Sequence, residues 1–127
     1  MLSETGHIVE AFLTSGRHSD VRGLRCYWFD LPPGYVVYAD KAYCDYGIED
    51  ALQAAKLTLK PLRKKHAKRQ YPPWEVYLQH SYRKRVEVSN SLIAQFLPKS
   101  IHAVMADGFQ LKVFLFIIAT NIKILFT

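Results

Sequence analysis

A short apolar run, Tyr35-Val36-Val37-Tyr38-Ala39, is the feature that most restricts what this chain can fold into. It lies between Gly34 and Asp40, and its length and unbroken apolar character are typical of a β-strand covered on both faces. Strands of that kind belong to parallel sheets, where ligands bind at the carboxyl ends of the strands. We therefore expect the Asp40 carboxylate at the sheet edge where ligands bind.

The segments before this run predict a strand and a helix. Residues 8–14 are apolar and β-branched, which favours a strand. Ser19 or Asp20 can cap a following helix, and the segment Leu31-Pro32-Pro33-Gly34 would end it. The apolar stripe of that helix is expected at Val21, Leu24, Tyr27 and Trp28.

The segments after the run continue the alternation. Ile48, Ala51, Leu52 and Ala55 have helical spacing from Gly47 onward, and residues 57–62 read as another strand. The order strand-helix-strand-helix-strand predicts an α/β fold whose sheet is at least partly parallel.

The second half of the chain predicts a basic loop and two helices. The loop covers residues 60–73 and includes five basic residues between positions 63 and 69, and a solvated loop without a partner is the alternative interpretation. A long helix is expected at about 74–96, ended by Pro98, with a stripe formed by Tyr82, Val86, Ser89, Ile93 and Phe96. The segment 109–126 predicts an apolar helix, or a helical hairpin broken near Asp107-Gly108.

The C-terminal apolar segment bears on localisation. Lys112 and Lys123 bracket only ten positions, whereas a membrane-spanning helix needs about 20 apolar residues. We therefore expect a buried terminal helix and no membrane partner, with an interfacial anchor as the alternative. The first six residues lack a basic leader and an apolar stretch, so a cytoplasmic protein is expected.

Composition narrows the class of partner only slightly. The chain of 127 residues fits one domain, and its 17 basic and 11 acidic residues give a net charge of +6, which favours polyanionic partners. Cys26 and Cys44 show no Cys-x-x-Cys spacing, so they indicate neither a zinc site nor a disulfide framework. Both are expected to be buried or half-buried thiols.

Asp40 and Glu87 are the candidate metal ligands. Carboxylates of this kind can share divalent ions that act on phosphodiesters. Arg83, Glu87 and Asn90 or Ser91 follow a spacing that puts them on one helix face, so a ligand and an anion clamp would lie together. In the alternative interpretation, Asp40 caps a turn and Glu87 pairs with Arg83, a contact worth only ~0.3–0.5 kcal/mol.

Five blocks of sequence carry a family resemblance. They are residues 9–14 with Gly16 and Ser19-Asp20, then Ala39-Asp40-Lys41-Ala42-Tyr43, residues 59–65, Tyr82-Arg83-Lys84-Arg85-Val86-Glu87, and residues 109–113. In this order they resemble the C-terminal part of the catalytic domain of bacterial insertion-sequence transposases of the DDE type. The resemblance covers nearly the whole chain.

The resemblance implies a ribonuclease-H-like fold, a mixed sheet flanked by helices, in which three carboxylates hold two Mg²⁺ or Mn²⁺ ions. Asp40 matches the second aspartate and Glu87 the glutamate. No Asp precedes Asp20, so nothing in the chain matches the first aspartate. The expectation is an N-terminally truncated domain, missing the first strand and most of the second, which is inactive alone. His80 and Ala94 stand where some relatives have a tyrosine and a lysine.

The resulting hypothesis is a truncated DDE transposase that cleaves DNA and transfers strands during transposition of an insertion sequence. Its partners would be the transposon ends, the target DNA, and a transposase homo-oligomer or full-length transposase. The alternative is a non-catalytic remnant that binds DNA or a transposase. The residues expected to contact DNA are Lys41, Lys60, Arg63, Lys64, Lys65, Lys68, Arg69, Arg83, Lys84 and Arg85.

Overall fold

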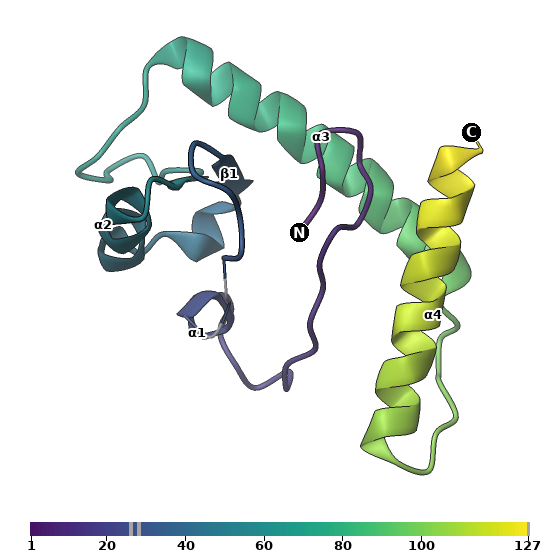
Figure 1. Ribbon diagram of the computed structural model, residues 1–127. Coiled ribbons are helices and arrows are strands. Elements are labelled where there is room, and N and C mark those ends of the chain that lie inside the picture. The colour runs from purple at the N-terminus through teal and green to yellow at the C-terminus, as the bar shows by residue number, and fades with distance from the viewer. Residues whose placement is uncertain (26, 28, 127) are drawn as a thin grey trace. The chain divides into compact units, whose positions relative to one another are not determined.

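The computed structural model of the protein describes residues 1–25, 27 and 29–126 (Figure 1). About half of the chain is helical, and a small parallel sheet completes a mixed α and β structure. The elements are α1 (Asp20–Arg25), β1 (Val36–Ala39), the 3₁₀ helix η1 (Lys41–Tyr43), α2 (Tyr46–Ala54), β2 (Thr58–Pro61), α3 (Pro73–Phe96) and α4 (Ala106–Leu125). The chain forms two compact units: unit 1 comprises residues 1–13 and 82–127, and unit 2 comprises residues 14–81.

The sheet of unit 2 confirms the prediction of parallel strands. β1 pairs with β2 in a register that runs from Val36 beside Thr58 to Ala39 beside Pro61, and α2 connects the two strands. Leu59 and Pro61 are buried on one face of β2. The expectation that β1 is covered on both faces is wrong, because Val36 is exposed and the other three residues are half-buried. A sheet with two described strands offers too narrow a surface for helices to cover both of its faces.

Local signals set the boundaries of these elements. Gly34 has a φ of +92°, which its missing side chain permits, and its N–H donates to the Lys56 carbonyl across 2.8 Å. The Asp45 carboxylate accepts hydrogen bonds from the N–H groups of Gly47 and Ile48, so it caps α2. The helix predicted from Gly47 is therefore confirmed, beginning one residue earlier.

The strand expected over residues 8–14 is wrong. Its one β-type pairing with other described residues is an isolated antiparallel bridge between Leu2 and Ile8. The Asn121 side chain accepts from the Ile8 N–H across 2.8 Å and donates to the Ile8 carbonyl across 2.7 Å. A strand needs a neighbouring backbone to pair with, and here a side-chain amide satisfies the polar groups of Ile8 instead.

The first predicted helix is shorter than expected. α1 ends at Arg25, and the Ser19 hydroxyl accepts from the Arg22 N–H across 3.4 Å near its start. Tyr27 lies beyond the helix. The expected stripe position Trp28 and the expected thiol of Cys26 fall outside the described residues, whereas Cys44 is a half-buried free thiol, as predicted.

The long helix agrees with its prediction in extent and in part of its stripe. α3 begins at Pro73, a residue well suited to the first turn of a helix, and ends at Phe96. Ser89 is buried, and its hydroxyl donates to the Gly6 carbonyl across 2.9 Å. Val86 lies in the predicted stripe but is exposed.

The C-terminal helix differs from its prediction in extent and burial. α4 begins at Ala106, so Asp107 and Gly108 lie in its first turn and do not break it. The expected burial is wrong, because only Thr120 is buried within α4. Its 20 residues and mean hydropathy of 1.5 make it long and apolar enough to cross a membrane, which is weak support for a span. The expectation of no span counted the ten positions between Lys112 and Lys123, whereas the helix extends beyond both lysines.

Candidate metal and DNA-binding site

Asp40 lies where the sequence predicted, immediately after β1. Its carboxylate is exposed and its Oδ1 accepts from the Lys41 N–H across 2.7 Å, which caps η1. Because β1 and β2 are parallel, this position is the carboxyl edge of the sheet. Asp40 thus lies where a ligand is expected. It also makes the capping contact that the alternative interpretation predicts.

Tyr43 is a neighbour of Asp40 to which the sequence analysis assigned no role. Burial raises the pKa of the Tyr43 hydroxyl, and the negative charges of Asp20 and Asp40 raise it further. Two carboxylates therefore act on one hydroxyl in unit 2. Asp20 is 20 residues from Asp40, and only the packing of α1 against η1 brings its charge near Tyr43.

Glu87 lies on α3 in unit 1 with its carboxylate exposed. Its Oε1 accepts from the Arg83 Nε across 3.2 Å, one helical turn away. The Ser91 hydroxyl donates to the Glu87 carbonyl and not to its carboxylate. The ion pair of the alternative interpretation is therefore present. An exposed pair of this spacing is weak, so Glu87 could exchange Arg83 for a metal ion at little cost.

The two predicted ligands belong to different units, Asp40 to unit 2 and Glu87 to unit 1. Their carboxylate oxygens are the donors that Mg²⁺ prefers. Among the described residues, no group of three or more His, Cys, Asp or Glu side chains comes together in a way that could hold a metal ion. Asp40 and Glu87 are thus exposed carboxylates in separate units, and neither belongs to such a group in the described part of the chain.

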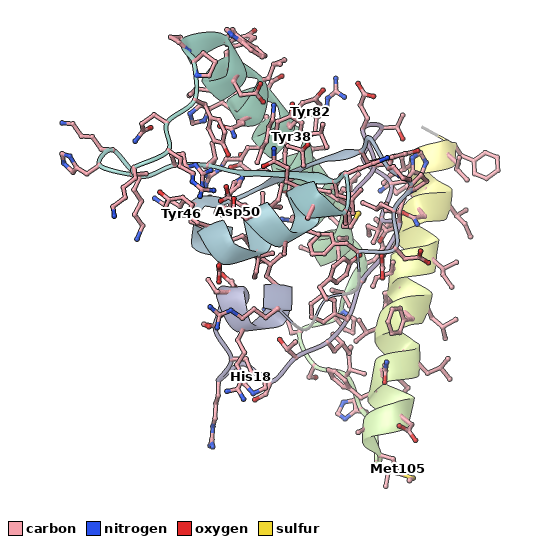
Figure 2. All side chains as sticks on the ribbon, turned by 60° about the vertical axis from the view of Figure 1, so that its left-hand side comes forward. His18, Tyr38, Tyr46, Asp50, Tyr82 and Met105 are labelled. Carbon is pink, nitrogen blue, oxygen red and sulfur yellow. The ribbon has the colours of Figure 1, made fainter. Side chains whose placement is uncertain are left out.

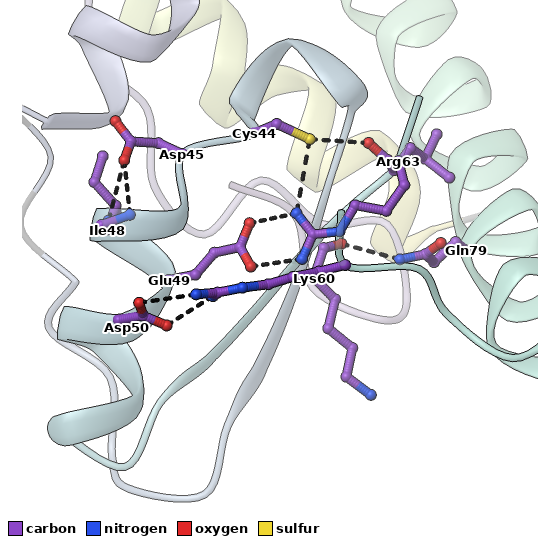
Figure 3. Close-up of polar contacts among 11 residues, drawn as sticks. Cys44, Asp45, Ile48, Glu49, Asp50, Lys60, Arg63 and Gln79 are labelled. Atoms are coloured by element: carbon purple, nitrogen blue, oxygen red, sulfur yellow. Dashed lines mark hydrogen bonds and ion pairs between the residues drawn. The ribbon is translucent and has the colours of Figure 1, made fainter. Parts of the chain in front are cut away.

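Arg63 was expected in an exposed basic loop, but its side chain is buried. Its two terminal nitrogens donate to both carboxylate oxygens of Glu49 across 2.5 and 2.6 Å, and the two side chains are only 5% and 9% exposed (Figure 3). The guanidinium also lies over the rings of Tyr46 and Tyr71. Glu49 accordingly holds the pKa of Arg63 above its usual range. A DNA phosphate could reach this group only after the fold opened.

Two further predicted DNA contacts pair with carboxylates of unit 2. Lys60 Nζ lies 3.1 Å from Glu75 Oε2, and the Lys60 carbonyl accepts from Gln79 Nε2. Arg69 forms a two-bond pair with Asp50 and lies over the Tyr46 ring. The Lys60 pair has a nearly buried carboxylate, whereas the Arg69 pair is exposed on both sides.

The remaining predicted DNA contacts of unit 2 face solvent. Lys41, Lys64, Lys65 and Lys68 are exposed, and no ion pair holds them in the part of the chain that the structure describes. The Gln70 side chain donates to the carbonyls of Lys64, Lys65 and Ala67, which fixes the backbone between them. This loop spans residues 62–72, because Lys60 and Pro61 belong to β2 and Pro73 to α3.

In unit 1, the three basic residues of α3 differ in their contacts. Arg83 pairs with Glu87, and Arg85 donates to the Glu4 carbonyl across 2.7 Å and lies over the Tyr82 ring. Lys84 is exposed and has no ion pair among residues 1–25, 27 and 29–126.

An open depression of about 240 Å³ lies beside the ion pairs of unit 2. Its lining combines carboxylates with cations, so it has no single sign of charge: the residues are Glu49, Asp50, Gln53, Thr58, Leu59, Lys60, Arg63, Arg69 and Tyr71. Figure 2 labels Tyr46 and Asp50 on α2 in this region. Burial raises the pKa of Tyr71 to about 12, and within the described parts of the chain its hydroxyl has no hydrogen-bond partner. The depression is not suited to a polyanion.

Comparison of the chain with protein-family models, with curated proteins and with solved structures gave no match.

Proposed function

We propose that this chain is part of the ribonuclease-H-like catalytic domain of a DDE transposase, an enzyme that cleaves DNA at transposon ends and joins them to a target. One observation carries most of the support: the exposed Asp40 carboxylate follows a parallel strand directly, at the edge where ligands bind in α/β sheets. The motif around it, with Lys41 and Tyr43, is one of the five blocks that carry the family resemblance.

Asp40 and Glu87 would hold the divalent ions. When bound, Mg²⁺ or Mn²⁺ lowers the pKa of a water molecule and stabilises the oxygens that enter and leave during phosphodiester displacement. Family members use three carboxylates, and the chain matches two of them, so the domain by itself should bind metal weakly and be inactive. A cytoplasmic location fits this proposal.

DNA would contact the exposed lysines. The loop that contains Lys64, Lys65 and Lys68 has a fixed backbone, and its lysines have no carboxylate partners among the described residues, which suits phosphate binding. Lys41 and Lys84 are exposed in the same way. Arg63, by contrast, is expected to hold unit 2 together.

Metal binding is tested by titrating the protein with Mn²⁺ and following the ion by electron paramagnetic resonance. Asp40→Asn keeps an oxygen that can cap η1 but loses the negative charge. Glu87→Gln on α3 likewise keeps one side-chain oxygen and loses the negative charge. Each should reduce Mn²⁺ affinity, whereas the control Asp30→Asn, also an exposed carboxylate, should not. Equal affinity in all four proteins would reject the ligand assignment.

DNA binding is tested by measuring affinity for a duplex over a series of salt concentrations. The slope of log K against log salt should be about −0.9 for each phosphate neutralised, so replacing Lys64, Lys65 and Lys68 by Gln should flatten it. Arg69→Gln, which removes a cation already paired with Asp50, should change the slope less. Salt-independent binding would contradict the proposal.

A second candidate is a non-catalytic partner that binds DNA or a full-length transposase. The capping bond of Asp40 and the Arg83–Glu87 ion pair favour it, since both carboxylates already have structural contacts. A protein that binds DNA with the expected salt slope, and whose Mn²⁺ affinity is unaffected by either substitution, would be of this kind.

A further inference from the structure

The helix α4 has an inner face with polar contacts and an outer apolar face. The inner face contacts other parts of unit 1: Thr120 is buried, Asn121 bonds to Ile8, and Lys123 lies over the Phe96 ring. The outer face is exposed and consists of Leu111, Leu115, Ile118, Ile122 and Leu125, each 50–68% exposed. Figure 2 shows the side chains along α4, which begins just after the labelled Met105.

The outer residues follow one spacing. They are separated by four, three, four and three positions, which is the 3.5-residue repeat of a coiled-coil seam. Leu115 and Ile122 take the a positions of this heptad, and Leu111, Ile118 and Leu125 take the d positions. We name these five residues the outer seam. Such a seam matches another helix with the same repeat.

The charges beside the outer seam favour one arrangement. Asp107 falls at a g position and Lys112 at the next e position. In a parallel pair of helices, each g residue faces the following e residue of the partner, so Asp107 of either copy would face Lys112 of the other. Both side chains are exposed; Lys112 also donates to the His102 carbonyl.

We propose that two copies of this chain associate through α4, parallel and in register, by packing their outer seams together. The seam residues expose roughly 500 Å² in one copy, so a pair would bury on the order of 1,000 Å², the lower end for specific interfaces. The association should therefore be moderate and depend on protein concentration. It requires neither metal nor DNA and is independent of the transposase assignment.

A bilayer is the other surface that α4 could enter. A spanning helix needs an apolar circumference, whereas Thr120, Asn121 and Lys123 are polar, and the inner face already packs on the chain. The outer seam is only as wide as the surface that one helix contacts on another. A second copy therefore fits the exposed surface better than lipid does.

Sedimentation equilibrium of the full chain over about a hundred-fold range of concentration tests the pairing. The wild type should shift from one to two copies, and Ile118→Lys should weaken the association about tenfold or more, because it puts a charge in the seam. The control Val88→Lys changes a similarly exposed residue of α3 and should associate like the wild type. A wild type that stays monomeric, or an assembly of more than two copies, would overturn the proposal.

Charge reversal tests the parallel register. Asp107→Lys and Lys112→Asp should each pair poorly with themselves, because like charges then face each other. A mixture of the two variants should pair again, because both contacts regain opposite charges, and this recovery excludes misfolding as the cause. Failure to recover would overturn the parallel arrangement. Wild type that pellets with phosphatidylcholine vesicles as a monomer, through a contact that Ile118→Lys abolishes, would assign the seam to lipid.

Discussion

The two units of the molecule place charge and apolar surface in opposite ways. Unit 2 buries charged groups: Glu75 is 2% exposed, and Glu49 and Arg63 form a pair almost closed to solvent. Unit 1 exposes apolar groups, above all the outer seam of α4. Charged residues are commonly found outside and leucines inside, so each unit departs from that rule.

The difference shows how the two units obtain their stability. Burying two charges costs hydration free energy, and an ion pair offsets this cost only when its hydrogen bonds are all formed. The contacts of unit 2 must therefore hold that region in one arrangement. A contiguous exposed apolar surface marks an interaction site. Unit 2 is thus organised by internal polar contacts, and unit 1 has surface left for a partner.

The largest effect should come from Arg63→Ala. This change leaves the Glu49 carboxylate buried without its partner, which should cost about 3–5 kcal/mol of unfolding free energy. The exposed pair of Arg69 and Asp50 is the matched control, and Arg69→Ala should cost no more than about 1 kcal/mol. Urea unfolding followed by circular dichroism gives both values. Equal losses would show that unit 2 does not depend on its buried charge.

Lys60→Ala should have the next largest effect. Among the described residues, Glu75 would lose the cation that pairs with it, and its Oε1 already has no hydrogen-bond partner there, so we expect a loss of about 2 kcal/mol. Lys60→Ala combined with Glu75→Leu should recover part of this loss, because the buried charge is then gone. The same unfolding assay measures both, and a double variant less stable than the single one would contradict the explanation.

Unit 1 offers a smaller polar test in Ser89→Ala. The buried hydroxyl donates to the Gly6 carbonyl, and removing it should cost about 1 kcal/mol. Ser91→Ala is the control, because the Ser91 hydroxyl bonds within its own exposed helix turn. A loss as large as that of Arg63→Ala would show that unit 1 also depends on buried polar contacts.

The smallest effect concerns Tyr71 and pH. Its pKa is raised from 10.0 to about 12, so the folded state keeps the proton where the unfolded state releases it. The stabilisation is present below pH 10.0 and is lost as the pH rises to about 12. Tyr71→Phe should remove this part of the alkaline loss and leave stability at neutral pH nearly unchanged. The measurement is a set of unfolding curves at both ends of that pH range. Tyr77→Phe, which replaces an exposed tyrosine, is the control.

Local sequence was a good guide to unit 2. The apolar run before Asp40 and the helical spacing after Gly47 predicted β1, α2 and the parallel pairing of β2, because each depends on short-range periodicity and on turn residues. The same reasoning failed for residues 8–14, whose apolar character suits a strand but whose neighbour is the Asn121 side chain. Helix α1 likewise ended far before the proline signal.

For the candidate site, the sequence by itself determined the position of Asp40 after a strand and the one-turn spacing of Arg83 and Glu87, because chain-local geometry fixes both. Only the tertiary structure decided which cations remain exposed. Arg63 and Lys68 look alike in sequence, yet one is buried against Glu49 and the other faces solvent. The physical reason is that an ion pair forms between residues that the fold brings together, and the 14 positions from Glu49 to Arg63 carry no local sign of that contact.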